Sequence, residues 1–133
     1  AASDRDGRER AGDRCEYCRM SQTIQGAAFH IEHIVPRAKG GADDADNLAL
    51  ACPSCNLRKS DTTDAADPLT VRLARLFHPR HDRWEDHFEF DGLRVVGRSP
   101  EGRATVRLLD LNTERRLAIR AIEGALGLSR KQG

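Results

Sequence analysis

The stretch CEYCRMSQTIQGAAFHIEHIVPRAKGGADDADNLALACPSCNLRK, residues 15–59, contains all four cysteines of the chain. They form two C-x-x-C pairs, Cys15 with Cys18 and Cys52 with Cys55. A disulfide within either pair would close almost no loop, which leaves a secreted scaffold with two long-range disulfides or one metal site. The N-terminal AASDRDGRER is not a secretory signal, which favours the metal. Because four thiolates suit a tetrahedral Zn²⁺, we expect one structural zinc here.

The residues between and after the cysteine pairs predict a small α+β unit. Residues 29–35 (FHIEHIV) have the β-branched, alternating pattern of a strand, which Pro36 ends, and residues 36–46 are a loop rich in Gly, Asp and Ala. The apolar residues 47–51 predict a return strand. Pro53 fits the first position of a helix that continues to about Ser60. The predicted order is strand, loop, strand and helix, a ββα unit held at both ends by zinc.

Four polar residues of this unit suit metal-assisted hydrolysis. Glu32 and His33 are adjacent at the end of the first strand, Asn47 opens the second strand, and Asn56 lies on the helix. Carboxylate and amide oxygens prefer Mg²⁺ to Zn²⁺. A neutral imidazole can accept a proton from water. A divalent cation with a general base is enough equipment to hydrolyse a phosphodiester.

Residues 15–59 resemble the HNH endonuclease family, whose ββα-metal core often lies between two such cysteine pairs. The resemblance implies that His33 is the general base and that Glu32 and Asn56 hold one Mg²⁺ or Mn²⁺. Asn47 would anchor the long loop through backbone hydrogen bonds and so orient His33. Glu32 stands where Asp is usual, and Asn56 where the family name has a second His. Implied products carry 5′-phosphate and 3′-hydroxyl ends.

The cations near this unit predict contacts to DNA phosphates. We assign this role to Arg37, Lys39, Arg58 and Lys59, although the last two could also form a solvated helix end. Net charge is only +1, but residues 93–133 carry nine basic and four acidic groups. Nineteen of the 22 cations are Arg. Arg suits phosphate binding, but a GC-rich genome would produce the same bias. Composition therefore permits a nucleic-acid partner without requiring one.

The C-terminal part of the chain, residues 67–112 (from DP to RLLDLN), is similar to an extension found in small bacterial members of this family. Residues 88–97 predict a hairpin turning at Asp91–Gly92, and Ser99 is expected to cap a helix ending near Leu111. A second helix is expected from residue 112 or 113 to about 127. The expected inward residues are Ala104, Leu108, Leu109, Leu117, Ile122 and Leu126. The expected exposed arginines are Arg115, Arg116 and Arg120.

Five histidines invite further metal sites, which the spacing does not favour. His30 and His33 face opposite sides of a strand, so they are not expected to share a metal. His78, His81 and His87 fit no compact ligand set. The spacing of Trp84 and Phe88 there indicates a turn and a short helix packed on the core.

Together these features predict an α+β protein with three parts. Residues 1–14 form an N-terminal helix or arm, residues 15–60 the zinc-held nuclease core, and residues 61–133 a connector, a hairpin and two helices. The expected activity is metal-dependent hydrolysis of DNA. We expect the protein to be cytoplasmic and to be encoded by a bacterium or a phage. The alternatives are a non-catalytic zinc-stabilised nucleic-acid-binding module and a zinc domain for protein interaction. No apolar run reaches the roughly 18 residues of a membrane span, and the oligomeric state stays open.

Overall fold

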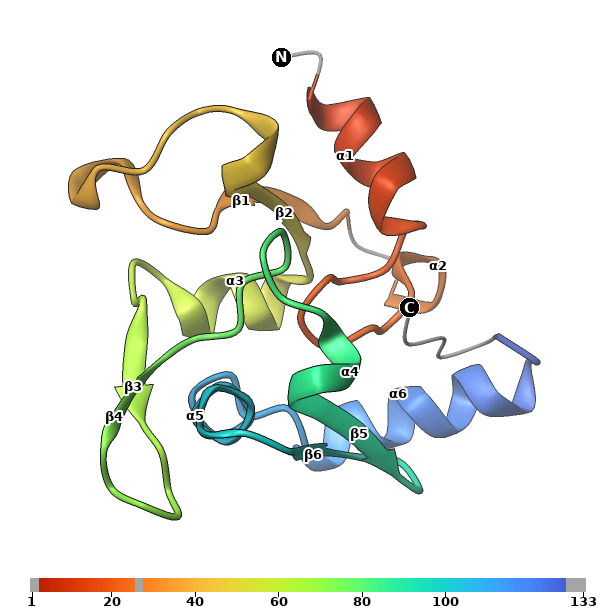
Figure 1. The fold of residues 1–133 in the computed structure, drawn as a ribbon. Helices are drawn as coiled ribbons and strands as arrows, with labels where there is room; N and C mark the ends of the chain where they lie inside the picture. The colour runs from red at the N-terminus through yellow and green to blue at the C-terminus, as the bar shows by residue number, and fades with distance from the viewer. Residues whose placement is uncertain (1–2, 26–27, 129–133) are drawn as a thin grey trace.

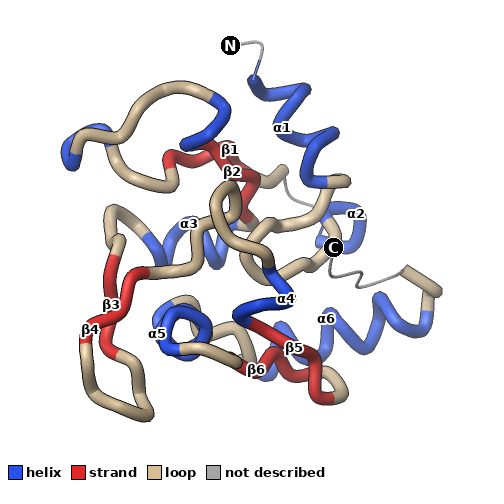
Figure 2. Tube along the Cα trace, in the orientation of Figure 1, coloured by secondary structure: helices blue, strands red, loops and turns tan. Residues whose placement is uncertain are grey.

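The structure is a computed structural model that describes residues 3–25 and 28–128. Its strands form three separate antiparallel pairs, with the helices packed around them (Figures 1 and 2). The elements are α1 (Ser3–Ala11), α2 (Gln22–Gln25), β1 (His30–His33), β2 (Leu48–Ala51), α3 (Pro53–Lys59), β3 (Asp64–Ala66), β4 (Leu73–Arg75), α4 (Trp84–His87), β5 (Phe88–Asp91), β6 (Arg94–Gly97), α5 (Pro100–Leu108) and α6 (Glu114–Ala125). Two short 3₁₀ turns, Arg37–Lys39 and Ala45–Asn47, lie in the loop between β1 and β2. The chain is a small mixed protein of helices and strands.

The first strand pair leads directly into a helix. β1 and β2 are antiparallel, with His33 opposite Leu48 and His30 opposite Ala51. All four residues of β2 are buried, since α1 and α3 both contact this strand. Cys52 caps α3, its sulfur accepting a hydrogen bond from Cys55 N, and Pro53 occupies the first turn as predicted. The second cysteine pair is therefore also the start of α3.

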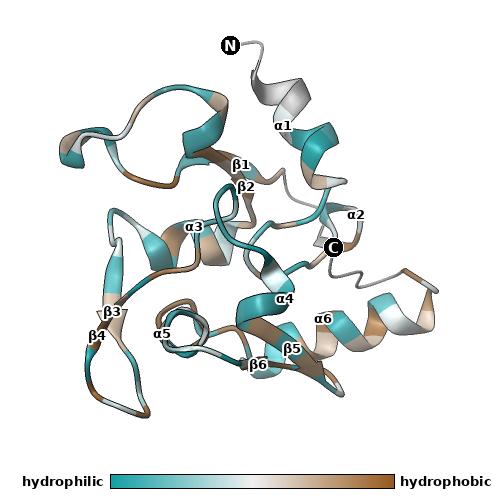
Figure 3. Cartoon of the chain, viewed as in Figure 1, coloured by the Kyte–Doolittle hydropathy of each residue, from teal (hydrophilic) through white to brown (hydrophobic). Residues whose placement is uncertain are grey.

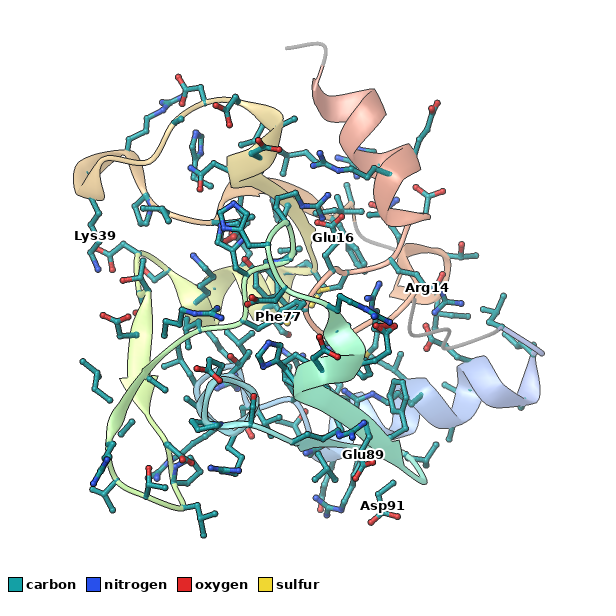
Figure 4. All side chains as sticks on the ribbon, viewed as in Figure 1. Arg14, Glu16, Lys39, Phe77, Glu89 and Asp91 are labelled. Carbon is teal, nitrogen blue, oxygen red and sulfur yellow. The ribbon has the colours of Figure 1, made fainter. Side chains whose placement is uncertain are left out.

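The core extends from the cysteines into the C-terminal half of the chain. Phe77 packs edge-on against Tyr17, with ring centroids 6.4 Å apart, and against Phe88 at 5.1 Å. Trp84 lies 5.0 Å from Phe88, and its indole nitrogen donates to the carbonyl of Tyr17 at 3.0 Å. The side chain of Phe77 lies at the centre of the molecule between these elements (Figure 4). The aromatic residues of α4 and β5 thus cover the first cysteine pair.

The β5–β6 hairpin and the start of α5 are as predicted, with small shifts in position. Asp91 pairs with Arg94, so the two-residue turn is Gly92–Leu93, one residue later than expected. The Ser99 hydroxyl accepts from Gly102 N and caps α5. The helix ends at Leu108 rather than near 111. Ala104 and Leu109 are buried and Leu108 is partly buried.

The expected orientation of α6 is wrong. Ile122 and Leu126 are 49% and 64% exposed, whereas Arg116 and Arg120 are each 1% exposed. Arg120 donates to Leu111 O at 2.7 Å and to Leu93 O at 3.0 Å, so it satisfies carbonyls in the loop after α5 and in the hairpin turn. Figure 3 shows brown apolar segments alternating with teal hydrophilic ones along the ribbon of α6. Buried acceptors, rather than apolar area, decide which face of α6 turns inward.

Residues 60–92 carry four basic and eight acidic groups, which predicts a solvated connector, but the structure places the β3–β4 hairpin in this stretch. Asp67, at its turn, is fully buried. Arg103 on α5 donates to both of its carboxylate oxygens, at 2.9 and 2.8 Å, and Thr70 donates at 2.9 Å. The turn closes through Val71 N to Asp67 O, which places Val71 at a φ of +65°. Part of the acidic excess is therefore neutralised inside the protein.

Candidate zinc site and candidate active site

The four cysteines converge on one point, as the sequence predicts. Their sulfur atoms all lie within 4.8 Å of one another, all four residues are buried, and none forms a disulfide. The sulfurs of Cys18 and Cys52 are 3.9 Å apart. A tetrahedral Zn²⁺ with bonds of about 2.3 Å separates its sulfur ligands by roughly 3.8 Å. The donor set and its size fit a structural zinc.

Neighbouring groups also favour thiolates at this site. Cys18 N donates to Cys15 Sγ at 3.5 Å, and Arg116 donates to Cys55 Sγ at 3.3 Å. Burial raises the pKa of the Cys15 and Cys55 thiols, so buried thiolates need a nearby cation. Burial alone would lower the pKa of Arg116, but the sulfurs raise it overall and keep the guanidinium charged. Zinc would supply most of the compensating charge.

A pocket of about 300 Å³ lies beside β1 and α3. It is lined by three of the four predicted catalytic residues, Glu32 and His33 from β1 and Asn56 from α3. The other lining residues are Pro36, Arg37, Ser60 and Asp61. The antiparallel pairing of β1 with β2, followed at once by α3, brings residues 24 positions apart to one cavity. Carboxylate, imidazole and amide groups therefore share one solvent-accessible space.

Glu32 is held by two buried partners. Its side chain is 8% exposed; Tyr17 donates to Oε2 at 2.8 Å, and Lys59 Nζ lies 3.6 Å from Oε1. Burial raises the pKa of Glu32, although Lys59 and Tyr17 act in the opposite direction. Burial lowers the pKa of Lys59, because it disfavours the charged form of this amine as it does that of the carboxylate. The carboxylate is fixed at the inner wall of the pocket.

His33 has a partner that the sequence does not single out. Its Nε2 lies 2.8 Å from Oδ1 of Asp43, and Arg37 Nε donates to the same oxygen at 2.7 Å. An ionised carboxylate only accepts, so Nε2 carries the proton and donates. These contacts hold the pKa of Asp43 below its usual value. Nothing in the sequence separates Asp43 from Asp44 and Asp46 in the same loop.

Asn47 joins the two ends of the loop between β1 and β2. Its side-chain amide donates to Val35 O at 2.9 Å and Ala42 O at 2.8 Å, while its oxygen accepts from Val35 N at 2.9 Å. Gly41 lies against this bridge, where a Cβ would fall 1.7 Å from Val35 O. The loop therefore closes tightly behind His33 and carries Asp43 toward it.

The cations assigned to phosphate contact differ in exposure. Arg37 and Lys39 are exposed on the β1–β2 loop, and Lys39 lies at its outer end (Figure 4). Arg58 is exposed on α3 and lies 3.6 Å from Asp110. Lys59 is 1% exposed, and its Nζ donates to Ile34 O at 2.8 Å. The prediction that Lys59 contacts phosphate is therefore wrong, because α3 turns it toward β1.

The other histidines form no further metal cluster in the described part of the chain, where the four cysteines are the one such group. His30 is exposed at the start of β1. His78 and His81 stack with ring centroids 3.8 Å apart. His78 Nδ1 accepts from backbone nitrogens, and His87 Nδ1 contacts the Ser99 hydroxyl at 2.6 Å. The ring of His78 therefore stabilises a turn, and the ring of His87 contacts the residue that caps α5.

Comparison with known proteins finds one family similarity, in the segment that contains both cysteine pairs. No curated protein and no solved structure matches the chain. Among residues 3–25 and 28–128, no helix is long and apolar enough to cross a membrane. A family model does match, over both cysteine pairs and all the residues that line the pocket. That model is described as HNH endonuclease and matches residues 15–62, so this part of the chain is similar to an HNH endonuclease domain.

Proposed function

We propose that this protein hydrolyses DNA phosphodiester bonds with the help of a divalent cation, and that β1, β2 and α3 form a ββα-metal core. The observation that carries the proposal is the pocket that Glu32, His33 and Asn56 line together. Its oxygen donors come from a carboxylate and an amide, which suits Mg²⁺ or Mn²⁺. The four-cysteine zinc site would hold the two ends of this core. Residues 1–14 and 61–133 would be an arm and an extension packed on it.

Each pocket residue has a role that its geometry supports. Glu32 and Asn56 would hold the Mg²⁺ or Mn²⁺, which when bound neutralises charge on the scissile phosphate and the departing 3′ oxygen. His33 donates from Nε2 to Asp43, so its Nδ1 carries the lone pair that accepts a proton from the attacking water. Attack of this water on the phosphorus with departure of the 3′ oxygen would leave a 5′-phosphate and a 3′-hydroxyl.

The exposed cations around the pocket would bind the DNA backbone. Arg37 lines the pocket itself, and Lys39 lies farther out on the same loop. Arg58 is on the exposed face of α3, from which Lys59 is excluded. Contacts of this kind position a duplex without reading its sequence. Cysteines that form no disulfide also suit a reducing compartment, so we propose that the protein acts in the cytoplasm.

One observation favours a second function, a zinc-stabilised module that binds nucleic acid without cutting it. The carboxylate of Glu32 already has a cation beside it, since Lys59 Nζ lies 3.6 Å away. A carboxylate neutralised in this way attracts a further cation less strongly. The two functions agree on DNA binding and differ on cleavage.

A plasmid-nicking assay separates them. Supercoiled DNA is incubated with the protein with and without Mg²⁺ or Mn²⁺, omitting the metal rather than chelating it, because a chelator could also remove zinc. We expect metal-dependent nicking that His33→Ala abolishes and Asp43→Asn lowers about tenfold. His81→Ala, which changes an exposed histidine outside the pocket, is the matched control. DNA binding without nicking by the zinc-loaded protein would favour the second function.

A further inference from the structure

The first cysteine pair contains a residue that reaches the candidate active site. Tyr17 lies between Cys15 and Cys18, is fully buried, and donates its hydroxyl to Glu32 Oε2 at 2.8 Å. Its backbone carbonyl accepts from Trp84 Nε1, and Phe77 packs edge-on against its ring. These contacts and its full burial hold the ring in place beside the cysteine pair. Tyr17 therefore links the first cysteine pair to the carboxylate of Glu32 by one hydrogen bond.

The second cysteine pair reaches the same carboxylate through α3. This helix is capped by Cys52, includes Cys55 and ends at Lys59. Lys59 Nζ lies 3.6 Å from Glu32 Oε1 and donates to Ile34 O, one residue beyond His33. The helix thus fixes both the Glu32 side chain and the backbone that follows His33. Each oxygen of Glu32 is contacted by an element that starts at one of the two cysteine pairs.

We propose that Tyr17 is a positioning residue that lets the zinc site hold Glu32 in the orientation needed to bind the catalytic divalent cation. The proposal rests on the proposed function and adds a physical connection between the two metal sites. A carboxylate that is 8% exposed has little water to replace a lost partner. Removing the hydroxyl leaves Oε2 free to rotate away from the pocket. Loss of an outer hydrogen bond to a metal ligand typically weakens metal binding or activity 10- to 100-fold.

The first test is Tyr17→Phe, which keeps the ring and removes the hydroxyl. Ser99→Ala is the matched control, because it also deletes one hydrogen-bonded hydroxyl but lies at the start of α5. For each protein we would measure zinc content, thermal unfolding, Mn²⁺ binding by electron paramagnetic resonance, and the Mn²⁺ concentration that gives half-maximal nicking. We expect Tyr17→Phe to keep its zinc and need about tenfold more Mn²⁺. Ser99→Ala should match the wild type in both Mn²⁺ measurements.

A second measurement does not depend on the variant folding. Tyr17 is the single tyrosine of the chain, so biosynthetic 3-fluorotyrosine labels this one position. Titration with Mg²⁺ should shift the ¹⁹F resonance in the wild type and leave it unmoved in Glu32→Gln. The half-point of the shift should agree with the Mg²⁺ dependence of nicking.

The outcomes distinguish this inference from the proposed function. If the wild type nicks DNA while Tyr17→Phe binds Mn²⁺ and nicks equally well, Tyr17 has no positioning role and the nuclease stands. An unmoved ¹⁹F resonance in an active wild-type protein overturns the inference in the same way. If the zinc-loaded wild type neither binds Mn²⁺ nor nicks, the proposed function falls and this inference falls with it.

Discussion

Arg116→Met tests the electrostatics of the zinc site from the C-terminal helix. Four thiolates and one Zn²⁺ carry a net charge of −2, and Arg116 places a cation against it, donating to Cys55 Sγ at 3.3 Å. The side chain is 1% exposed, so water does not screen the contact. Its Nη2 has no hydrogen-bond partner among the described residues, which leaves the Cys55 contact as the main polar loss.

The expected magnitude follows from that geometry. A hydrogen bond involving a charged group contributes about 1.5–3 kcal/mol. Methionine fills a similar apolar volume and removes the cost of burying a guanidinium, which offsets part of the loss. We therefore expect the lower end, about 1.5 kcal/mol, which corresponds to roughly tenfold weaker zinc binding. The variant should also unfold at a lower temperature when zinc is limiting.

Competition with a chromophoric zinc chelator measures the effect directly. The control is Arg115→Met, the same change at the preceding residue, which is exposed. Arg116→Met should release zinc to the chelator at about tenfold lower chelator concentration than either the wild type or Arg115→Met. Equal zinc retention by all three proteins would refute the reasoning that a buried cation stabilises this site.

Two further predictions concern the β3–β4 turn. Val71→Gly should stabilise the protein by about 1 kcal/mol, because a β-branched residue at a φ of +65° is strained and its side chain is 80% exposed; Leu73→Gly, in β4, should instead destabilise it in urea unfolding. Arg103 holds the pKa of Asp67 below its usual value, so Asp67 stabilises the fold above about pH 4 and loses that contribution as the pH falls further. The difference in unfolding free energy between wild type and Asp67→Asn should therefore shrink below about pH 4, and a constant difference would contradict the assignment.

The parts of the fold that the sequence predicts well depend on local chemistry. Cys52 and Pro53 start α3, and Ser99 caps α5, because a helix start is decided by a few adjacent residues. The hairpin at residues 88–97 follows in the same way from its turn residues. The convergence of the cysteines follows from spacing. In the helix starts and the hairpin, and within each cysteine pair, the determining groups lie within a few residues of one another.

The parts that it misses depend on partners far away in the chain. Lys59 looks like a solvated helix end until α3 is placed against β1, where Ile34 O needs a donor. Asp43 gains its role when Asn47 closes the loop behind His33. The polar face of α6 turns inward because Arg116 meets a sulfur 61 residues away. Amphipathic periodicity counts apolar area and cannot count buried acceptors.

The C-terminal extension is best understood as part of the site. The family match ends at residue 62, and a unit of this size with one two-stranded sheet has only a small core of its own. Trp84 donates to the carbonyl of Tyr17, and Arg116 donates to Cys55, so each cysteine pair is contacted from the extension. Glu123 accepts a hydrogen bond at 2.5 Å from the backbone nitrogen of Ser21, which lies three residues after Cys18. Because Tyr17 in turn contacts Glu32, packing in residues 84–123 bears on the geometry of the pocket. Substitutions there should be evaluated for their effect on both metal sites as well as on stability.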